Sequence, residues 1–391
     1  MQRVSEWVEQ ARACLSRNDA EGADVALLEA LKVAPGDLEA SLDLAEALLD
    51  LGRMEEAVSL LEQLRLLHPQ SMDVLHNLAY ALVEADELER AAECVDQALS
   101  REPAHPDAHN NLGLLREAEG ELEAAIEAFE AALRHDPEHL YALFNLLRAL
   151  EAVGDLEGLI RQLRTALERS PGERGLRSWL AQALLEQGEA KLAIHELKRL
   201  LRDDPDDAST YGALGMAYRD QRKWAPAIES FQRAVTLDPE HAMAWFYLAM
   251  SYADHHQPEA AIRTYRELLA LWPHEADAHN NLGYLLMERG ELAEALWEFQ
   301  QALRINPVLA KAQLNLGEAL RLKGDVEGAI AHLERAIEAM PTESAVHYNL
   351  ALIFAELGRT ERALQHCKRC LSLNLRDEQA QRLMRHLRAS R

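Results

Sequence analysis

Ten prolines recur at an interval of 34 residues along this chain of 391 residues. They are Pro35, Pro69, Pro103, Pro137, Pro171, Pro205, Pro239, Pro273, Pro307 and Pro341. A fixed period of this length indicates one supersecondary unit copied along the chain, in which each copy completes the core of its neighbour. Counting back from the prolines gives eleven units, from 4–37 to 344–377, followed by a tail at 378–391.

Two columns of small residues recur within the units. Alanine or glycine stands ten residues after every lattice proline except Pro137, as at Gly113, and alanine stands twelve residues further on, as at Ala125. Two helices approach closely only where side chains are small, so each unit is predicted to be an antiparallel helical hairpin. A turn glycine such as Gly120 ends the first helix, and the lattice proline ends the second.

Two units carry most of the residues of a known repeat pattern. One has Tyr211, Leu214, Gly215, Tyr218, Ala227, Phe231, Ala234 and Pro239, and the other has Trp245, Leu248, Ala249, Tyr252, Ala261, Tyr265 and Pro273. The pattern resembles the tetratricopeptide repeat (TPR). The resemblance covers residues 4–377. It implies an all-α, right-handed superhelical solenoid of eleven hairpins, with residues 378–391 as a C-terminal capping helix.

Charge is distributed unevenly along the chain. Residues 1–139 hold 10 Lys/Arg against 31 Asp/Glu, a net charge of −21, whereas residues 344–391 hold 9 against 4, a net charge of +5. The acidic first third would repel phosphates, which argues against nucleic acid and anionic membrane as partners. No stretch is apolar enough for a transmembrane helix, residues 1–18 do not read as a secretory signal, and we expect a cytoplasmic location.

The unit at 140–173 departs from the pattern. It carries Leu147 and Leu159 at both small positions, and the next unit has Arg177 where an aromatic residue is usual. We predict a joint, and the chain divides into an acidic segment 4–139, irregular units 140–207, a second segment 208–377 and the basic tail 378–391. Alternatively, the two leucines repack together without consequence for function.

Asparagines form a column on the predicted first helices: Asn77, Asn111, Asn145, Asn281, Asn315 and Asn349. A primary amide offers donors and an acceptor, and can therefore bind the backbone of an extended peptide. The column and the string His279-Asn280-Asn281-Leu282-Gly283 resemble the repeat region of O-GlcNAc transferases, without their catalytic domain. The resemblance implies peptide binding in a concave groove. The alternative is that each amide bonds only to a neighbouring helix or to water.

An apolar patch interrupts this column. Met216, Phe246, Tyr247 and Met250 are expected to face the groove, because methionine and aromatic side chains suit an adaptable recognition surface. Core packing is the alternative. Acidic residues are expected in the groove of the first third, namely Glu39, Asp43, Glu46, Asp50, Asp73, Glu84 and Asp107. They indicate either a partner with basic segments or a solvated face that keeps the array soluble.

No catalytic site, metal site or cofactor is predicted. Cys367 and Cys370 form a CxxC pair that occupies apolar columns inside a helix, so we expect them to be core residues. His109, His279 and His347 replace the consensus aromatic residue, and packing is their expected role.

We therefore predict a non-catalytic scaffold that binds extended segments of partner proteins. One alternative is a self-assembling protein, in which the basic tail docks on the acidic units of another copy as a possible homo-oligomer. Another is a non-catalytic subunit of a glycosyltransferase-type complex.

Overall fold

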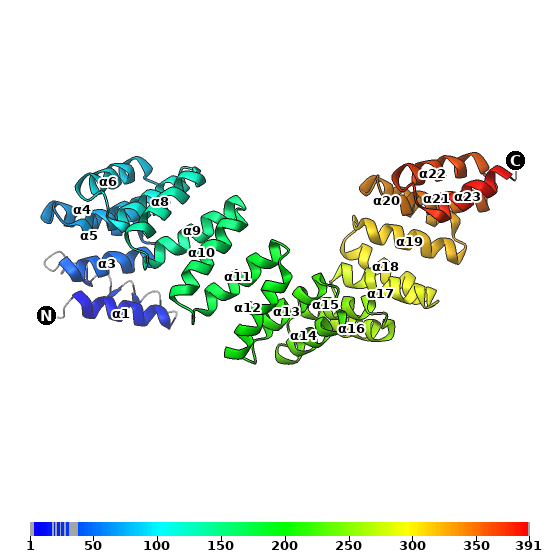
Figure 1. Ribbon diagram of the computed structural model, residues 1–391, viewed down its shortest axis with the longest axis horizontal. Coiled ribbons are helices and arrows are strands. Elements are labelled where there is room, and N and C mark those ends of the chain that lie inside the picture. The colour runs from blue at the N-terminus through cyan, green and yellow to red at the C-terminus, as the bar shows by residue number, and fades with distance from the viewer. Residues whose placement is uncertain are drawn as a thin grey trace. The chain divides into compact units, whose positions relative to one another are not determined.

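The chain is helical throughout its described part. The computed structural model describes residues 4–17, 19, 22–23, 25–26, 29–30 and 38–389. Those residues contain 22 helices and no strand, which confirms the predicted all-α class (Figure 1). None of these helices combines the length and the apolar character needed to cross a membrane.

The helices follow one another as the first and second members of hairpins. The first helices are α3 (Leu38–Asp50), α5 (Met72–Glu84), α7 (Pro106–Ala118), α9 (Leu140–Val153), α11 (Arg174–Glu186), α13 (Ala208–Asp220), α15 (Ala242–Asp254), α17 (Ala276–Glu288), α19 (Ala310–Lys323) and α21 (Ser344–Glu356). The second helices are α4 (Met54–Leu67), α6 (Leu88–Arg101), α8 (Leu122–His135), α10 (Leu156–Arg169), α12 (Ala190–Asp203), α14 (Trp224–Leu237), α16 (Pro258–Leu271), α18 (Leu292–Ile305), α20 (Val326–Ala339) and α22 (Thr360–Leu373).

Two further helices lie at the ends, α1 (Val4–Ser16) and α23 (Glu378–Ala389). The unit at 4–37 is only partly described beyond α1. The count of eleven hairpins and the handedness of the superhelix therefore stay predictions.

The helix ends lie where the sequence pattern placed them. The second helix α8 ends at His135, two residues before Pro137, and α14 ends at Leu237, two residues before Pro239. The residue before a proline avoids the helical conformation. The seven turn glycines have φ between 69° and 91°, the left-handed region that glycine occupies without a steric penalty.

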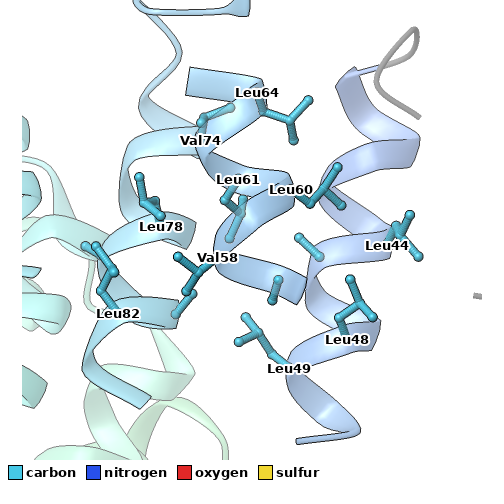
Figure 2. Packing of buried hydrophobic residues seen from close by; sticks show 14 of the residues in the cluster. Leu44, Leu48, Leu49, Val58, Leu60, Leu61, Leu64, Val74, Leu78 and Leu82 are labelled. Atoms are coloured by element: carbon cyan, nitrogen blue, oxygen red, sulfur yellow. The ribbon is translucent and has the colours of Figure 1, made fainter. Parts of the chain in front are cut away.

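The small columns lie at the contact between the two helices of each hairpin. A Cβ atom added to Gly113 would stand 2.3 Å from the ring of Phe129, so a larger residue cannot fit there. Ala125, opposite it on α8, is completely buried. Leucine and valine side chains from α3, α4 and α5, including Leu44, Leu61 and Leu78, fill the space between the hairpins (Figure 2).

The chain divides into two compact units, residues 1–173 (unit 1) and 174–391 (unit 2). The boundary falls within the irregular stretch 140–207. Leu147 and Leu159 are both fully buried, and α9 and α10 are less closely packed on each other than the helices of any other described hairpin. Flexing at this place stays a prediction.

Arg177 does not disturb its hairpin. It is 3% exposed and its Nη1 donates to Glu196 Oε2 at 2.7 Å, so that a buried ion pair within α11–α12 takes the place of the usual aromatic contact.

The last helix, α23, covers the end of unit 2. It packs on α22 and α21 through Ala380 and Leu387, which are buried, and Leu383, which is partly buried. Its arginines point to solvent. This confirms the predicted capping helix.

Within each unit, successive first helices, such as α5 and α7, pack on one another. Successive second helices lie further apart. The first helices therefore stand on the inner side of the local curve. We call the surface that they present the inner face of unit 1 or of unit 2.

Candidate functional site

The asparagine column lies on the inner faces, but its members differ in exposure. Asn111 and Asn349 are 4% and 5% exposed, and are therefore buried. The remaining four, Asn77, Asn145, Asn281 and Asn315, are partly exposed.

Three of these amides join neighbouring first helices. The Nδ2 of Asn111 donates to the carbonyl oxygen of His76 at 2.7 Å, which links α7 to α5. Asn145 and Asn315 donate to the Oδ1 of an asparagine on the preceding first helix, each at 2.9 Å. The column thus fixes the register between hairpins. One such bond does not exhaust an amide, which has two N–H donors and a carbonyl acceptor.

The predicted apolar patch forms a connected aromatic cluster in unit 2. Met216, Phe246, Tyr247 and Met250 are all partly buried. The ring of Phe246 meets Tyr247 edge-on at 5.7 Å and Tyr265 at 6.0 Å between centroids. Tyr265 is fully buried, and its hydroxyl accepts a hydrogen bond from Asn281 at 3.1 Å. The patch therefore rests on the core and is continuous with the asparagine column.

Arg219, which the sequence analysis missed, lies across this patch. Its guanidinium stands 5.3 Å from the ring centroid of Tyr247 and 3.7 Å from the sulfur of Met250. It also donates to Asp254 at 2.9 Å. A guanidinium held over an aromatic face gives the patch a positive, hydrogen-bonding edge.

The 34-residue register reveals two more inner-face residues. Tyr80 and Tyr284 stand in the same column as Met216 and Met250, and are 36% and 45% exposed. The lattice itself could have indicated them, since each is a whole number of repeats from a predicted member.

The inner face of unit 1 is acidic and carries exposed aromatic rings. The carboxylates at Glu39, Asp43, Glu46, Asp50, Asp73 and Glu84 are exposed, and Asp107 is partly exposed. Burial raises the pKa of Tyr80, and the nearby carboxylates of Glu84 and Asp50 raise it further. Tyr141 and Phe144 on α9 are 73% and 50% exposed.

The repeat column that contains His109 and His279 has a structural role that the sequence alone did not reveal. Four of its members each place a side-chain nitrogen 2.9–3.1 Å from the carbonyl oxygen of the lattice proline six residues earlier, namely His109, Trp245, His279 and Gln313. This contact ties the end of one hairpin to the start of the next.

The CxxC pair lies in the core of unit 2. Cys367 and Cys370 are both fully buried. Burial raises the pKa of both thiols, and that of Cys370, which donates to Asp377 at 3.4 Å, reaches about 12. Both remain protonated at neutral pH, as befits core residues.

The cavities found among the described residues lie away from the asparagine column. Each is a cleft whose walls include two successive second helices, such as α8 and α10 in unit 1 or α16 and α18 in unit 2. The cleft beside α16 is lined in part by Trp297 and by the buried pair His279–Glu298, whose side chains approach to 2.6 Å.

Comparisons with known proteins agree on the repeat. Profiles described as tetratricopeptide repeat match residues 15–71, 76–158, 160–310 and 320–387. No curated protein sequence matches the chain significantly.

Several solved structures of repeat proteins superpose on parts of the chain. The C-terminal part of a TPR repeat-containing protein from Cytophaga hutchinsonii superposes with a TM-score of 0.52 at 17% identity, covering 62% of this chain and 99% of that one. MamA gives a TM-score of 0.40 at 28% identity over 41% of this chain and 95% of its own. YrrB, described as a TPR protein with an unusual peptide-binding site, superposes with a TM-score of 0.42 at 18% identity, covering 48% of this chain and 97% of YrrB. The specific likeness to O-GlcNAc transferases stays a prediction.

Proposed function

Because this chain belongs to the tetratricopeptide repeat family, we propose that it is a protein-interaction scaffold that binds extended segments of partner proteins on its inner faces. Repeats of this kind typically serve as interaction scaffolds, and no catalytic domain is indicated.

The observation that carries the proposal is the inner face of unit 1. It combines exposed carboxylates on α3 and α5 with the exposed aromatic rings of Tyr80 on α5 and of Tyr141 and Phe144 on α9. An aromatic ring beside a carboxylate binds the stem and the charged head of a lysine or arginine together. We infer that unit 1 prefers partner segments with basic and apolar residues in alternation.

The partly exposed asparagines supply the sequence-independent part of the binding. Asn77, Asn145, Asn281 and Asn315 reach the inner face from successive hairpins, and their free donors and acceptors suit the backbone of an extended chain. Buried Asn111 links α7 to α5 and so helps to hold these hairpins in register. The cluster formed by Phe246, Tyr247, Met250 and Met216 would accept an apolar side chain in unit 2, next to Arg219.

The proposal can be tested with labelled peptides and fluorescence anisotropy. Two unstructured peptides of equal length, one with lysines and leucines in alternation and one with glutamates replacing the lysines, are titrated with the full chain. We expect the basic peptide to bind. Its affinity should fall as the salt concentration rises, because salt screens the attraction between exposed charges. The acidic peptide should not bind.

Two triple variants locate the site. Glu46→Gln with Asp50→Asn and Glu84→Gln removes three inner-face charges and should weaken the basic peptide at least tenfold. Glu89→Gln with Glu93→Gln and Asp96→Asn removes three exposed charges from α6, a second helix, and is the matched control. Equal weakening by both triples would show a diffuse charge effect and contradict an inner-face site.

Self-association is the second candidate function. Arg382, Arg385 and Arg388 are exposed on α23, while unit 1 is acidic, so unlike ends of two copies attract. Light scattering at low and high salt separates the two functions. A chain that stays monomeric at low salt and micromolar concentration excludes this second function and leaves the first untouched.

A further inference from the structure

Two neighbouring first helices of unit 1 bring a cluster of imidazole and carboxylate groups together. His76 comes from α5, Asp107 from the first turn of α7, and His105 from the residue that precedes α7. We propose that His76, His105 and Asp107 form a binding site for a divalent transition metal, with Zn²⁺ as the reference ion. This proposal does not depend on peptide binding, although Asp107 also belongs to the inner face of unit 1.

The donor atoms are already close. One ligand atom from each of His76, His105 and Asp107 lies within 4.8 Å of the others. Donors about 2.1 Å from a tetrahedral zinc ion are about 3.4 Å apart, so side-chain rotations alone can close the remaining distance. The imidazole rings of His76 and His105 are 5.9 Å apart between centroids, with 38° between their planes.

Two ring nitrogens in the cluster lack a partner. The Nδ1 atoms of His76 and His105 are both buried and make no hydrogen bond among the described residues. A buried polar atom without a partner is costly, and a bound metal ion would satisfy it. His279, by contrast, meets this need with the carboxylate of Glu298.

The local charge favours a cation. The charged or titratable groups that act on His76 are the carboxylates of Asp107 and Asp73 and the imidazoles of His105 and His139. The two carboxylates bring negative charge to the cluster, which suits a bound cation, and an imidazole binds a metal ion in its neutral form.

His139, which begins α9, acts as a positioning residue. Its Nδ1 accepts from the backbone N–H of Ala142 at 3.1 Å, which leaves its Nε2 to donate to Asp107 Oδ1 at 2.9 Å. This bond lowers the pKa of Asp107 and keeps the carboxylate ionised. The second oxygen of Asp107 stands 3.8 Å from His105 Nδ1 and is free to turn toward the ion.

Two imidazoles and one carboxylate leave a fourth position open, which suits zinc and similar ions. The ion would join α5 to α7 at the point where Asn111 already donates to the carbonyl oxygen of His76. We expect it to stiffen unit 1 and to expose one coordination position to water or to a donor group of a partner.

The test is calorimetric titration of the metal-free full chain with ZnCl₂, with Co²⁺ absorption as a second probe of coordination. We expect one strong zinc site per chain. The substitutions His76→Gln and His105→Gln should each lower its zinc affinity at least tenfold. His195→Gln removes an exposed histidine from unit 2 and should leave the affinity unchanged. Binding should also raise the melting temperature of the parent chain but not that of His105→Gln.

His139→Asn tests the positioning role. Asparagine keeps a capping acceptor for α9 but loses the bond to Asp107, so zinc affinity should fall about tenfold while the metal-free melting temperature is kept. If His76→Gln unfolds the chain, His105→Gln decides, because His105 makes no side-chain cap bond. Absence of a strong site, or a strong site that survives His105→Gln, overturns the proposal.

Discussion

Units 1 and 2 use the same hairpin and the same asparagine column, yet they present different inner faces. Unit 1 presents exposed carboxylates together with the exposed rings of Tyr80, Tyr141 and Phe144. In unit 2 methionine and aromatic side chains gather under Arg219. Under the proposed function, the asparagines would supply backbone-directed contacts common to both units, while each unit would select different side chains.

The interiors of the hairpins differ as well. Four hairpins of unit 2 contain a polar pair 19 residues apart: Arg177–Glu196, His279–Glu298, Gln313–His332 and His347–His366. The corresponding pair in α7–α8 of unit 1 is His109 with Ala128, and the one in α5–α6 is Leu75 with Cys94. Unit 2 thus contains buried groups whose interaction depends on charge.

The largest expected effect concerns the buried ion pair. Glu196→Gln leaves Arg177 buried without its counter-charge and should lower the free energy of unfolding of unit 2 by about 3 kcal/mol. Tryptophan fluorescence in a urea titration reports unit 2, because five of the six tryptophans lie there. Arg199→Ala removes the exposed neighbour of Glu196, at 3.6 Å, and should cost less than about 1 kcal/mol. Equal losses of unfolding free energy in the two variants would contradict a stabilising role of the pair Arg177–Glu196.

The next effect compares one position in both units. Gly113→Ala places a methyl group against Phe129 and should destabilise by about 2 kcal/mol. Gly283→Ala meets Phe299 at the slightly longer distance of 2.8 Å and should cost less. Circular dichroism during denaturation measures both.

A second substitution tests the cause. Ala79 stands opposite Val95, so Gly113→Ala with Phe129→Val reproduces a pair that the chain already contains. The double variant should be more stable than the sum of the two single losses implies. Simple additivity would show that the ring of Phe129 is not what excludes the methyl group.

A smaller effect comes from the hairpin turns. Asp86, Arg222 and His256 have φ of 59°, 54° and 57°, where the other turns have glycine. Arg222→Gly and His256→Gly in unit 2 should each raise stability by about 0.5–1 kcal/mol. Asp86→Gly in unit 1 should gain less, because aspartate tolerates this conformation. Thermal unfolding measures the stability of the three variants. A loss of stability in all of them would contradict the expectation that the native turn conformations are strained.

The smallest effect is a pH dependence of opposite sign in the two units. Burial lowers the pKa of His76, so its contribution to unit 1 is present above pH about 6.5 and lost as pH falls. At His279 burial opposes the shift, but the bond to Glu298 raises the pKa, so that contribution is present below pH about 6.5 and lost as pH rises through the raised value.

In the whole chain these two contributions partly cancel. Glu298→Gln should therefore reduce the stability of unit 2 more at pH 5.5 than at pH 8, as followed by tryptophan fluorescence. A loss independent of pH would show that His279 stays neutral in the folded state.

Much of the candidate site could be expected from the register alone. Tyr80 and Tyr284 belong to the column of Met216 and Met250, because all four positions are separated by whole multiples of 34 residues. The exposure of the two tyrosines follows from this position on the first helix. Arg219 could not be foreseen, because its contacts with Tyr247 and Asp254 join two hairpins. The burial of Asn111 likewise depends on the distance between α5 and α7.

The period of 34 residues by itself determined the hairpin, its turns and its ends. Proline and glycine act through local backbone sterics, and the small columns let the two helices of one unit approach closely. Only the packed structure decided which polar groups meet. His76, His105 and Asp107 stand in three different repeat columns, and they come together because α5 and α7 lie side by side. Local rules specify the unit, whereas partners between units depend on how the units stack.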